Sequence, residues 1–358
     1  MKDRIKCGVL GAGWWATFAH IPALLSHPRA ELWAIQKSDI DQALKVAADF
    51  GIPHAFSSAA ELLAIEELQA VVVSSSPNLH YEQAAAALRM GKHVLVEKPM
   101  TLTTTQARDL LELAYDRNLQ FLISCPWHYT VHAAAAQRLI QEGMLGKLRM
   151  ISVLMTNPVS HLLRGESAIP THNAETPYLR PHTSTYSDPK IAGGGQIYAQ
   201  VCHVAAYLTF LTGVSASDVF ARFHNDGAAL DIYNALDLRM QDDTIVTIAS
   251  TGATSMSLRT YEVRLFGTDG MLYLDPWRGT MEFISMSGQH QPYPDLNQDD
   301  IYPHQAPAIN LIDSIFDPSL NRSPASLGVA AMEIIEAACV SAKCGTNVLV
   351  RSLMEQKL

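Results

Sequence analysis

Short apolar runs alternate with longer helix-type segments over the first third of the chain. Two of the intervening segments, DIDQALKVAADFG and TTTQARDLLELAYDRN, have apolar residues at helical spacing, and the second opens with a Thr103 to Gln106 capping box. The apolar runs are IKCGVL, ELWAIQ, AVVVSSS, HVLVEKP and QFLISC. Strands that alternate with helices predict an α/β fold with a doubly wound parallel sheet.

The pattern changes after residue 125. A helix-type segment and the strand LRMISVLM lead into a long polar loop, which ends at GGGQIYAQVCH and an apolar helical segment. The runs that follow are VFARFH, LDIYNALDLRM, TIVTIAST, YEVRLFG, MLYLD and MEFIS. Because QDD and GTDG between them are typical of hairpin turns, this sheet is expected to be mainly antiparallel and open. We therefore expect a dinucleotide-binding domain at 1–125 and an α+β domain at 126–358.

Composition narrows the classes of function. The chain has 358 residues and a formal net charge of -9, and it lacks a basic run, so a nucleic-acid partner is not expected. Its five cysteines form no CxxC pair or zinc spacing, which favours a reducing compartment and no metal site. No signal-peptide pattern and no apolar stretch near the ~18 residues of a membrane helix is evident. We expect a cytoplasmic protein without a membrane partner.

The turn GAGWWA directly follows the first apolar run. Gly11 would allow the tight turn, and Gly13 would let the backbone approach a pyrophosphate at a helix N-terminus. This GxGxxA pattern alone also fits a strand-turn-helix connection without a ligand. However, SSSPN and EKP also fall at strand carboxyl ends, where ligands bind in such sheets. We expect a cofactor there, with Trp14 and Trp15 among its contacts.

The residues after ELWAIQ bear on which dinucleotide binds. Lys37 and Ser38 stand at the expected strand end, where an acidic residue usually binds the ribose hydroxyls. A cation and a hydroxyl suit a 2′-phosphate, so NADP is favoured. Asp39 leaves NAD as an alternative, and a solvated surface lysine is the plain structural interpretation.

Several ordered motifs together resemble the Gfo/Idh/MocA family of NAD(P)-dependent oxidoreductases. They are the glycine turn, SSSPNLHYEQAAAALRMGKHVLVEKPM, EGMLGKLRMI and GGGQIYAQVCH. The resemblance covers nearly the whole chain. It implies an N-terminal Rossmann domain, a C-terminal domain whose open sheet pairs subunits into a homodimer or homotetramer, and hydride transfer at a sugar or polyol carbinol or carbonyl.

The resemblance also implies roles for particular residues. Lys98 matches the lysine that contacts the nicotinamide ribose and the substrate hydroxyl and takes part in proton transfer, and His203 matches a histidine at the substrate carbinol. Glu97 and Asn78 correspond to residues at the cofactor, and we add their neighbours to the expected contacts: Ser76 and His80. The sequence departs from the family at Ala199, where many members carry aspartate, so a Lys, Asp and His proton relay is incomplete.

The chemistry supports Lys98 and His203 independently. Hydride transfer from a carbinol leaves a proton, and a base whose pKa lies near the operating pH accepts it efficiently. Histidine meets this condition, and burial or a nearby positive nicotinamide brings lysine closer to it. Helical spacing places Gln196, Gln200 and His203 on one stripe. The structural alternatives are a hydrogen-bonded core histidine and an exposed strand-end lysine.

Trp127 and His128 begin the second domain directly after the last strand of the first. We expect them to form a substrate site with Tyr186, Asp188, Tyr198 and Gln200, although each also suits packing. Amide, hydroxyl and indole groups favour a carbohydrate substrate. Two alternatives to a dehydrogenase remain: a redox-assisted sugar lyase or glycosidase that retains its cofactor, and a cofactor-dependent sugar sensor without turnover.

Overall fold

The computed structural model describes residues 4–166 and 177–350, which form two compact units. Among the described residues, unit 1 comprises 4–126, 177–185 and 304–328, and unit 2 comprises 127–166, 186–303 and 329–350. The sequence predicts two domains that are each one continuous stretch of chain, divided at residue 125. In the structure each unit is assembled from three separate stretches. Residues 304–328 join the first unit because their helix packs against its sheet.

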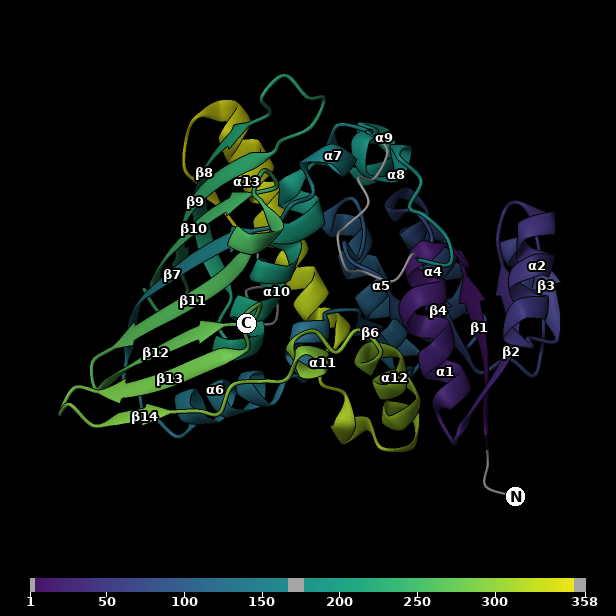
Figure 1. Cartoon of the computed structure of the whole chain (residues 1–358), viewed down its shortest axis with the longest axis horizontal. Helices are drawn as coiled ribbons and strands as arrows, with labels where there is room; N and C mark the ends of the chain where they lie inside the picture. The colour runs from purple at the N-terminus through teal and green to yellow at the C-terminus, as the bar shows by residue number, and fades with distance from the viewer. Residues whose placement is uncertain (1–3, 167–176, 351–358) are drawn as a thin grey trace. The chain divides into compact units, whose positions relative to one another are not determined.

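Unit 1 is built on a six-stranded parallel sheet in the order β3-β2-β1-β4-β5-β6 (Figure 1). Its strands are β1 (Ile5–Leu10), β2 (Ala30–Gln36), β3 (His54–Phe56), β4 (Ala70–Val73), β5 (His93–Val96) and β6 (Phe121–Ile123). The doubly wound prediction is confirmed, and the short β3 is an addition to it. The order reverses between β1 and β4, which is the switch point where such sheets bind ligands.

The helices of unit 1 follow the strands in turn. They are η1 (Ala16–His20), α1 (Ile21–Ser26), α2 (Ile40–Phe50), α3 (Ala59–Leu63), α4 (Pro77–Arg89), α5 (Thr104–Asp116), α12 (Ala306–Phe316) and η5 (Pro318–Leu320). The Thr103 side chain accepts a hydrogen bond from the Gln106 amide and so begins α5 as its capping box predicts. Helix α12 packs against α1, β5 and β6, and its residues Leu311 and Ile312 are fully buried.

Unit 2 is built on a nine-stranded sheet in the order β14-β13-β12-β11-β7-β10-β9-β8-β15. Its strands are β7 (Leu148–Thr156), β8 (Ala216–His224), β9 (Tyr233–Met240), β10 (Ile245–Thr251), β11 (Thr260–Gly267), β12 (Gly270–Asp275), β13 (Thr280–Ser285), β14 (His290–Pro292) and β15 (Val348–Leu349). Only the β7 and β10 pair is parallel among these neighbours. The expected hairpins at QDD and GTDG join β9 to β10 and β11 to β12.

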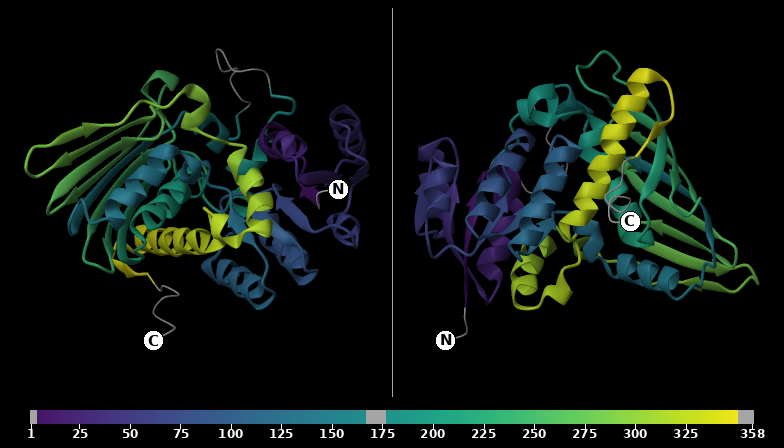
Figure 2. Two further views of the ribbon diagram at one scale, coloured as in Figure 1. Left: turned by 90° about the horizontal axis from the view of Figure 1, so that it is seen from below. Right: turned by 180° about the vertical axis from the view of Figure 1, so that it is seen from behind.

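Helices α6, α10 and α13 lie along one face of this sheet (Figure 2). The helices that lie wholly or partly in unit 2 are η2 (Pro126–Tyr129), α6 (Val131–Gln141), α7 (Ser160–Leu163), α8 (Ser184–Ser187), α9 (Pro189–Ala192), η3 (Ile197–Val201), α10 (Cys202–Thr212), η4 (Met256–Leu258), α11 (Gln298–Ile301) and α13 (Ala325–Cys344). Buried and exposed residues alternate strictly along β9, so its other face is open.

Helix α13 is the one described helix with the length and apolar composition that a membrane crossing requires. In its most apolar window, 61% is buried inside the protein, and a core helix meets the same criteria in this way. This burial inside the protein accounts for its composition.

Candidate functional site

The glycine turn after β1 combines one glycine that the fold requires with one that it does not. Gly11 has φ +77°, and a Cβ there would overlap the Ser75 backbone. A Cβ on Gly13 would meet nothing closer than the Gly11 carbonyl oxygen at 3.9 Å. No side chain or backbone atom of the described structure therefore fills the space beside Gly13. The turn leads directly into the helical segment Ala16–Ser26, so this space fits the pyrophosphate of a dinucleotide.

The end of β2 supports this turn from the side. The buried Gln36 side chain accepts a hydrogen bond from the Gly11 amide at 3.2 Å and donates one to the Ser57 carbonyl at 2.8 Å. Half-buried Lys37 and exposed Ser38 follow. The Asp39 carboxylate begins α2 as its N-cap, and the Gln42 amide is the main cause of its lowered pKa.

His80 connects the loops that follow β4 and β5. Its Nδ1 lies 2.8 Å from the Pro99 carbonyl oxygen, and its Nε2 lies 3.0 Å from that of Ser75. The ring is buried, and burial lowers the pKa of His80 against the effect of these carbonyl contacts. Of the other expected cofactor contacts on α4, Ser76 is the N-cap residue and Asn78 is exposed.

Glu97 is the centre of a buried polar network beside the glycine turn. Its Oε1 accepts hydrogen bonds from Trp15 Nε1 and pairs with His20 Nε2, both at 2.8 Å. Trp15 lies on the turn, where its ring also contacts Trp14. Lys98, the next residue after Glu97, is half-buried. The expected cofactor residues of unit 1 thus follow the carboxyl ends of β1, β2, β4 and β5.

Sequence reasoning missed His20. The available signal was a histidine inside the otherwise apolar segment TFAHIPALL, which is the same kind of signal that drew attention to His203. The partner of such a residue, here Glu97, lies 77 positions away and becomes evident only in the folded chain.

In unit 2, His203 lies near the start of α10 and is 3% exposed. Its ring meets Trp127 edge-on with a centroid separation of 5.1 Å. Trp127 is the centre of an aromatic group, which we call the Trp127 cluster. Its ring centroids lie between 4.7 and 5.1 Å from those of His203, Tyr261, Trp277 and Tyr302. Trp277 and Tyr302 were not expected from the sequence.

The triple glycine at 193–195 allows Asp231 to approach the start of the helical segment that carries His203. The Asp231 carboxylate accepts hydrogen bonds from the Gly195 and Ile197 amides, both at 2.8 Å. A Cβ on Gly195 would overlap the Asp231 backbone, so only glycine permits this approach. Asp231 was also missed, because the apolar pattern predicted it within the strand LDIYNALDLRM, whereas the structure begins β9 only at Tyr233 and leaves Asp231 in the preceding loop.

The expected stripe of Gln196, Gln200 and His203 is wrong in detail. Residues Ile197–Val201 form a π-helical turn, whose wider hydrogen-bond pattern breaks the regular 3.6-residue spacing. Gln196 donates to the Ser250 hydroxyl at 2.9 Å and is thereby held against the sheet. Gln196 thus joins an internal hydrogen-bond contact, as a buried polar side chain requires.

Two family models match this chain in succession. Residues 5–124 match a model described as an oxidoreductase family with an NAD-binding Rossmann fold. Residues 133–273 match the GFO/IDH/MocA C-terminal domain. The chain belongs to the Gfo/Idh/MocA family.

Individual Gfo/Idh/MocA relatives show how far this similarity reaches. An uncharacterized oxidoreductase of Synechocystis is 34% identical over 60% of this chain and 53% of its own length. A dTDP-3,4-didehydro-2,6-dideoxy-alpha-D-glucose 3-reductase of Streptomyces antibioticus is 29% identical over 76% of each chain. The structure of levoglucosan dehydrogenase with NADH and L-sorbose has a TM-score of 0.80 at 17% identity, covering 98% of this chain and 100% of that one. This last similarity concerns the fold.

The other expected substrate residues of this Gfo/Idh/MocA protein are spread through unit 2. The His128 ring is buried and stacks on the Phe210 ring of α10 with a centroid separation of 4.5 Å. Tyr198 is 7% exposed, and burial raises its pKa. Asp188 begins α9 by accepting a hydrogen bond from the Lys190 amide, and Tyr186 lies in the neighbouring α8. Packing or capping accounts for the first three, so their substrate roles stay predictions, as do those of Tyr186 and Gln200.

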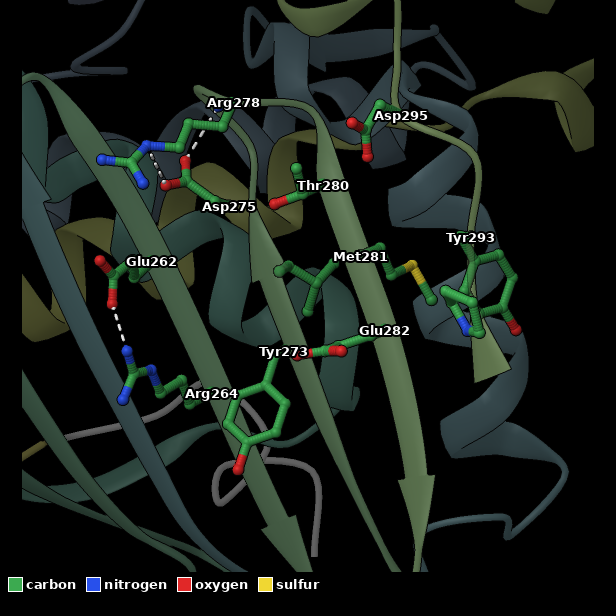
Figure 3. A pocket seen from close by; sticks show the side chains of 12 residues that line it. Glu262, Arg264, Tyr273, Asp275, Arg278, Thr280, Met281, Glu282, Tyr293 and Asp295 are labelled. Atoms are coloured by element: carbon green, nitrogen blue, oxygen red, sulfur yellow. Dashed lines mark hydrogen bonds and ion pairs between the residues drawn. The ribbon is translucent and has the colours of Figure 1, made fainter. Parts of the chain in front are cut away.

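A pocket of about 720 Å³ lies elsewhere, on the open face of the unit 2 sheet (Figure 3). Its walls come from β11 to β14 and the segment after β14. Glu262 pairs with Arg264 there, and Asp275 pairs with Arg278. None of the expected site residues lines this pocket.

Proposed function

We propose that this protein is an NADP(H)- or NAD(H)-dependent dehydrogenase or reductase that acts on a sugar or polyol carbinol or carbonyl. The observation that carries the proposal is the contact between Trp15 of the glycine turn and Glu97. Lys98 directly follows Glu97 in the chain, and both belong to the same compact unit as the glycine turn, so this contact supports a position for Lys98 beside the expected cofactor. The sugar assignment is supported by the relative that reduces a dTDP-linked keto sugar and by the levoglucosan dehydrogenase fold.

The bound nicotinamide would supply or accept the hydride. The chain's own task is then to manage the proton on the substrate oxygen. Lys98 would hold the oxygen through its amine, and the buried imidazole of His203 would pass the proton on. The edge-on contact with Trp127 fixes the His203 ring, which suits a base that must keep one orientation. Lys98 lies in unit 1 and His203 in unit 2, so their convergence stays a prediction.

The first test removes these two groups separately. We expect Lys98→Ala and His203→Ala to retain the wild-type melting temperature within a few degrees and to lose turnover by about a hundredfold or more. Turnover is measured by NAD(P)H absorbance with sugars first selected by thermal shift. Full activity in both variants would refute the assigned roles.

We further propose NADP as the preferred cofactor. Lys37 offers a cation directly after β2, Ser38 offers a hydroxyl, and the Asp39 carboxylate is engaged by Gln42 at the start of α2. Asp39 is therefore less available for ribose hydroxyls. We expect Lys37→Asp to shift the ratio of KM values toward NADH by about tenfold or more, since a carboxylate repels the 2′-phosphate. An unchanged ratio would remove the argument for NADP.

Ala199 supports keeping two alternative functions. It replaces the aspartate that many family members carry, so a three-residue relay is incomplete. A redox-assisted lyase or glycosidase would form product without net change in NAD(P)H. A sensor would show sugar-dependent stabilisation without turnover of any sugar in a broad panel. Net oxidation or reduction of the cofactor with a sugar would exclude both.

We also propose a cytoplasmic homodimer or homotetramer that pairs through the open sheet face. The side chains of Met150, Leu154 and Ile245 are exposed on the strands of this sheet. Apolar groups on an uncovered face favour association. Light scattering should give at least a dimeric mass, and Ile245→Glu should lower it. A monomeric wild type would contradict this proposal.

A further inference from the structure

The Glu97 carboxylate is unusual because it is charged, deeply buried and adjacent to the proposed catalytic lysine. Its residue is only 7% exposed. Oε1 is shared by Trp15 and His20, and Oε2 lies 3.2 Å from the backbone amide of Lys98. The carboxylate therefore connects three segments: the glycine turn, the first helix and the loop after β5.

Packing alone does not explain this arrangement. A buried carboxylate costs desolvation that an apolar side chain of similar volume avoids. Burial by itself would raise the pKa of Glu97, but the hydrogen bond and charge of His20 and the charge of Lys98 hold it below its ordinary value. The chain thus maintains an anion at this point, one residue before Lys98.

The donors to Glu97 are themselves held in place. His20 is fully buried at the end of η1. The centroid of the Trp15 ring lies 5.8 Å from that of Phe18 and 6.4 Å from that of His304. The Phe18 and His304 rings stack with their centroids 4.5 Å apart. These contacts set the direction of the indole N–H. Both donors therefore lie on the segment that begins with the glycine turn, and both are packed among other side chains.

We propose that Trp15 and His20 are positioning residues that set the placement of Lys98 through Glu97. The glycine turn, which binds the cofactor phosphates, and the lysine that handles the substrate proton are thereby linked through one carboxylate. This inference rests on the proposed function, because it gives Lys98 its role there. It adds His20, a residue that neither the sequence motifs nor the family match assign.

The experiment compares three histidine variants in the full-length protein. His20→Leu fills the same space without a donor, and His20→Gln restores an N–H at a similar reach. His27→Leu is the matched control, because His27 lies at the end of α1 and pairs with the Asp313 carboxylate at 3.2 Å, away from Glu97.

We expect His20→Leu to lower kcat by about tenfold or more, because a small misplacement of a reacting group is costly. The KM for NADPH should stay within about threefold, which separates positioning from cofactor binding. His20→Gln should recover most of kcat, and His27→Leu should match wild type even if its melting temperature falls as far. If His20→Leu does not fold, Trp15→Phe, which keeps an aromatic ring and removes the N–H, replaces it and is judged by the labelling of Lys98, because Trp15 is itself an expected cofactor contact.

A second readout does not depend on turnover. Trace acetylation by acetic anhydride, followed by mass spectrometry, reports how the Lys98 amine is held. We expect its labelling rate to change by about threefold or more in His20→Leu and to stay at the wild-type value in His20→Gln and His27→Leu. Equal rates in all variants would overturn the proposal. Changed rates without any sugar turnover by wild type would uphold the positioning and refute only the proposed function.

Discussion

At the scale of single residues, the two glycines of the turn after β1 separate folding from binding. Gly11 is required by its positive φ and by the Ser75 backbone, whereas the space beside Gly13 is open. We expect Gly11→Ala to cost about 2 kcal/mol or more of folding free energy. Gly13→Ala should keep wild-type stability and weaken NADPH binding by about tenfold or more, because its methyl group fills the place of the phosphates.

Thermal unfolding and NADPH fluorescence titration measure the two effects. Gly91 is a suitable control for the strain alone, because it has φ +74° and no atom lies within 4 Å of a Cβ placed there. Gly91→Ala should lower stability without changing NADPH affinity. Wild-type affinity in Gly13→Ala would mean that the phosphates do not bind at this turn.

At the scale of elements, Asp231 holds the start of the helical segment that follows Gly193–Gly195, which we call the glycine-led helix. Its carboxylate accepts hydrogen bonds from two backbone amides at the start of this helix. It also accepts one from the side-chain Nδ2 of Asn234 at 2.9 Å. We expect Asp231→Ala to destabilise the protein by about 1–3 kcal/mol, since these donors lose their acceptor. Because the same helix carries His203, sugar turnover should fall as well.

Urea unfolding followed by circular dichroism measures the loss. Asp116→Ala is the matched control, because Asp116 is exposed at the end of α5 and lies in unit 1, not in the sheet of unit 2. Its effect should stay within about 0.5 kcal/mol. Equal stability of the two variants would show that the helix begins without this carboxylate.

At the scale of the whole molecule, buried titratable groups predict loss of stability in acid in two steps. Burial lowers the pKa of His80, His93 and His132, so the unfolded chain takes up protons first as pH falls. Their contribution is complete above the ordinary histidine value of ~6.5 and declines below it. The lowered pKa of Glu97 gives a contribution that is present above ~4.3 and is lost at lower pH.

Urea midpoints measured from pH 8 to pH 3 test this order. His80→Gln should flatten the decline below pH ~6.5, because His80 is the most deeply buried of the three histidines. His224→Gln, at an exposed position of β8, should leave the curve unchanged. A wild-type decline in His80→Gln would mean that His80 does not contribute to the first step.

The sequence by itself determined the features that local chemistry specifies. Strands and helices followed from apolar periodicity, and the parallel and antiparallel sheets followed from alternation and turn residues. The need for glycine at Gly11 followed from its turn. These features depend on residues within a few positions of one another, so the order of residues along the chain is enough to predict them.

Only the tertiary structure decided which distant groups meet. The contacts of His20 and Trp15 with Glu97, of Asp231 with the glycine-led helix, and of Trp277 with Trp127 join residues far apart in the chain. The π-helical turn before His203 likewise replaced a regular stripe. Such contacts are selected by burial and hydrogen-bond satisfaction over the whole unit, and no local pattern encodes them.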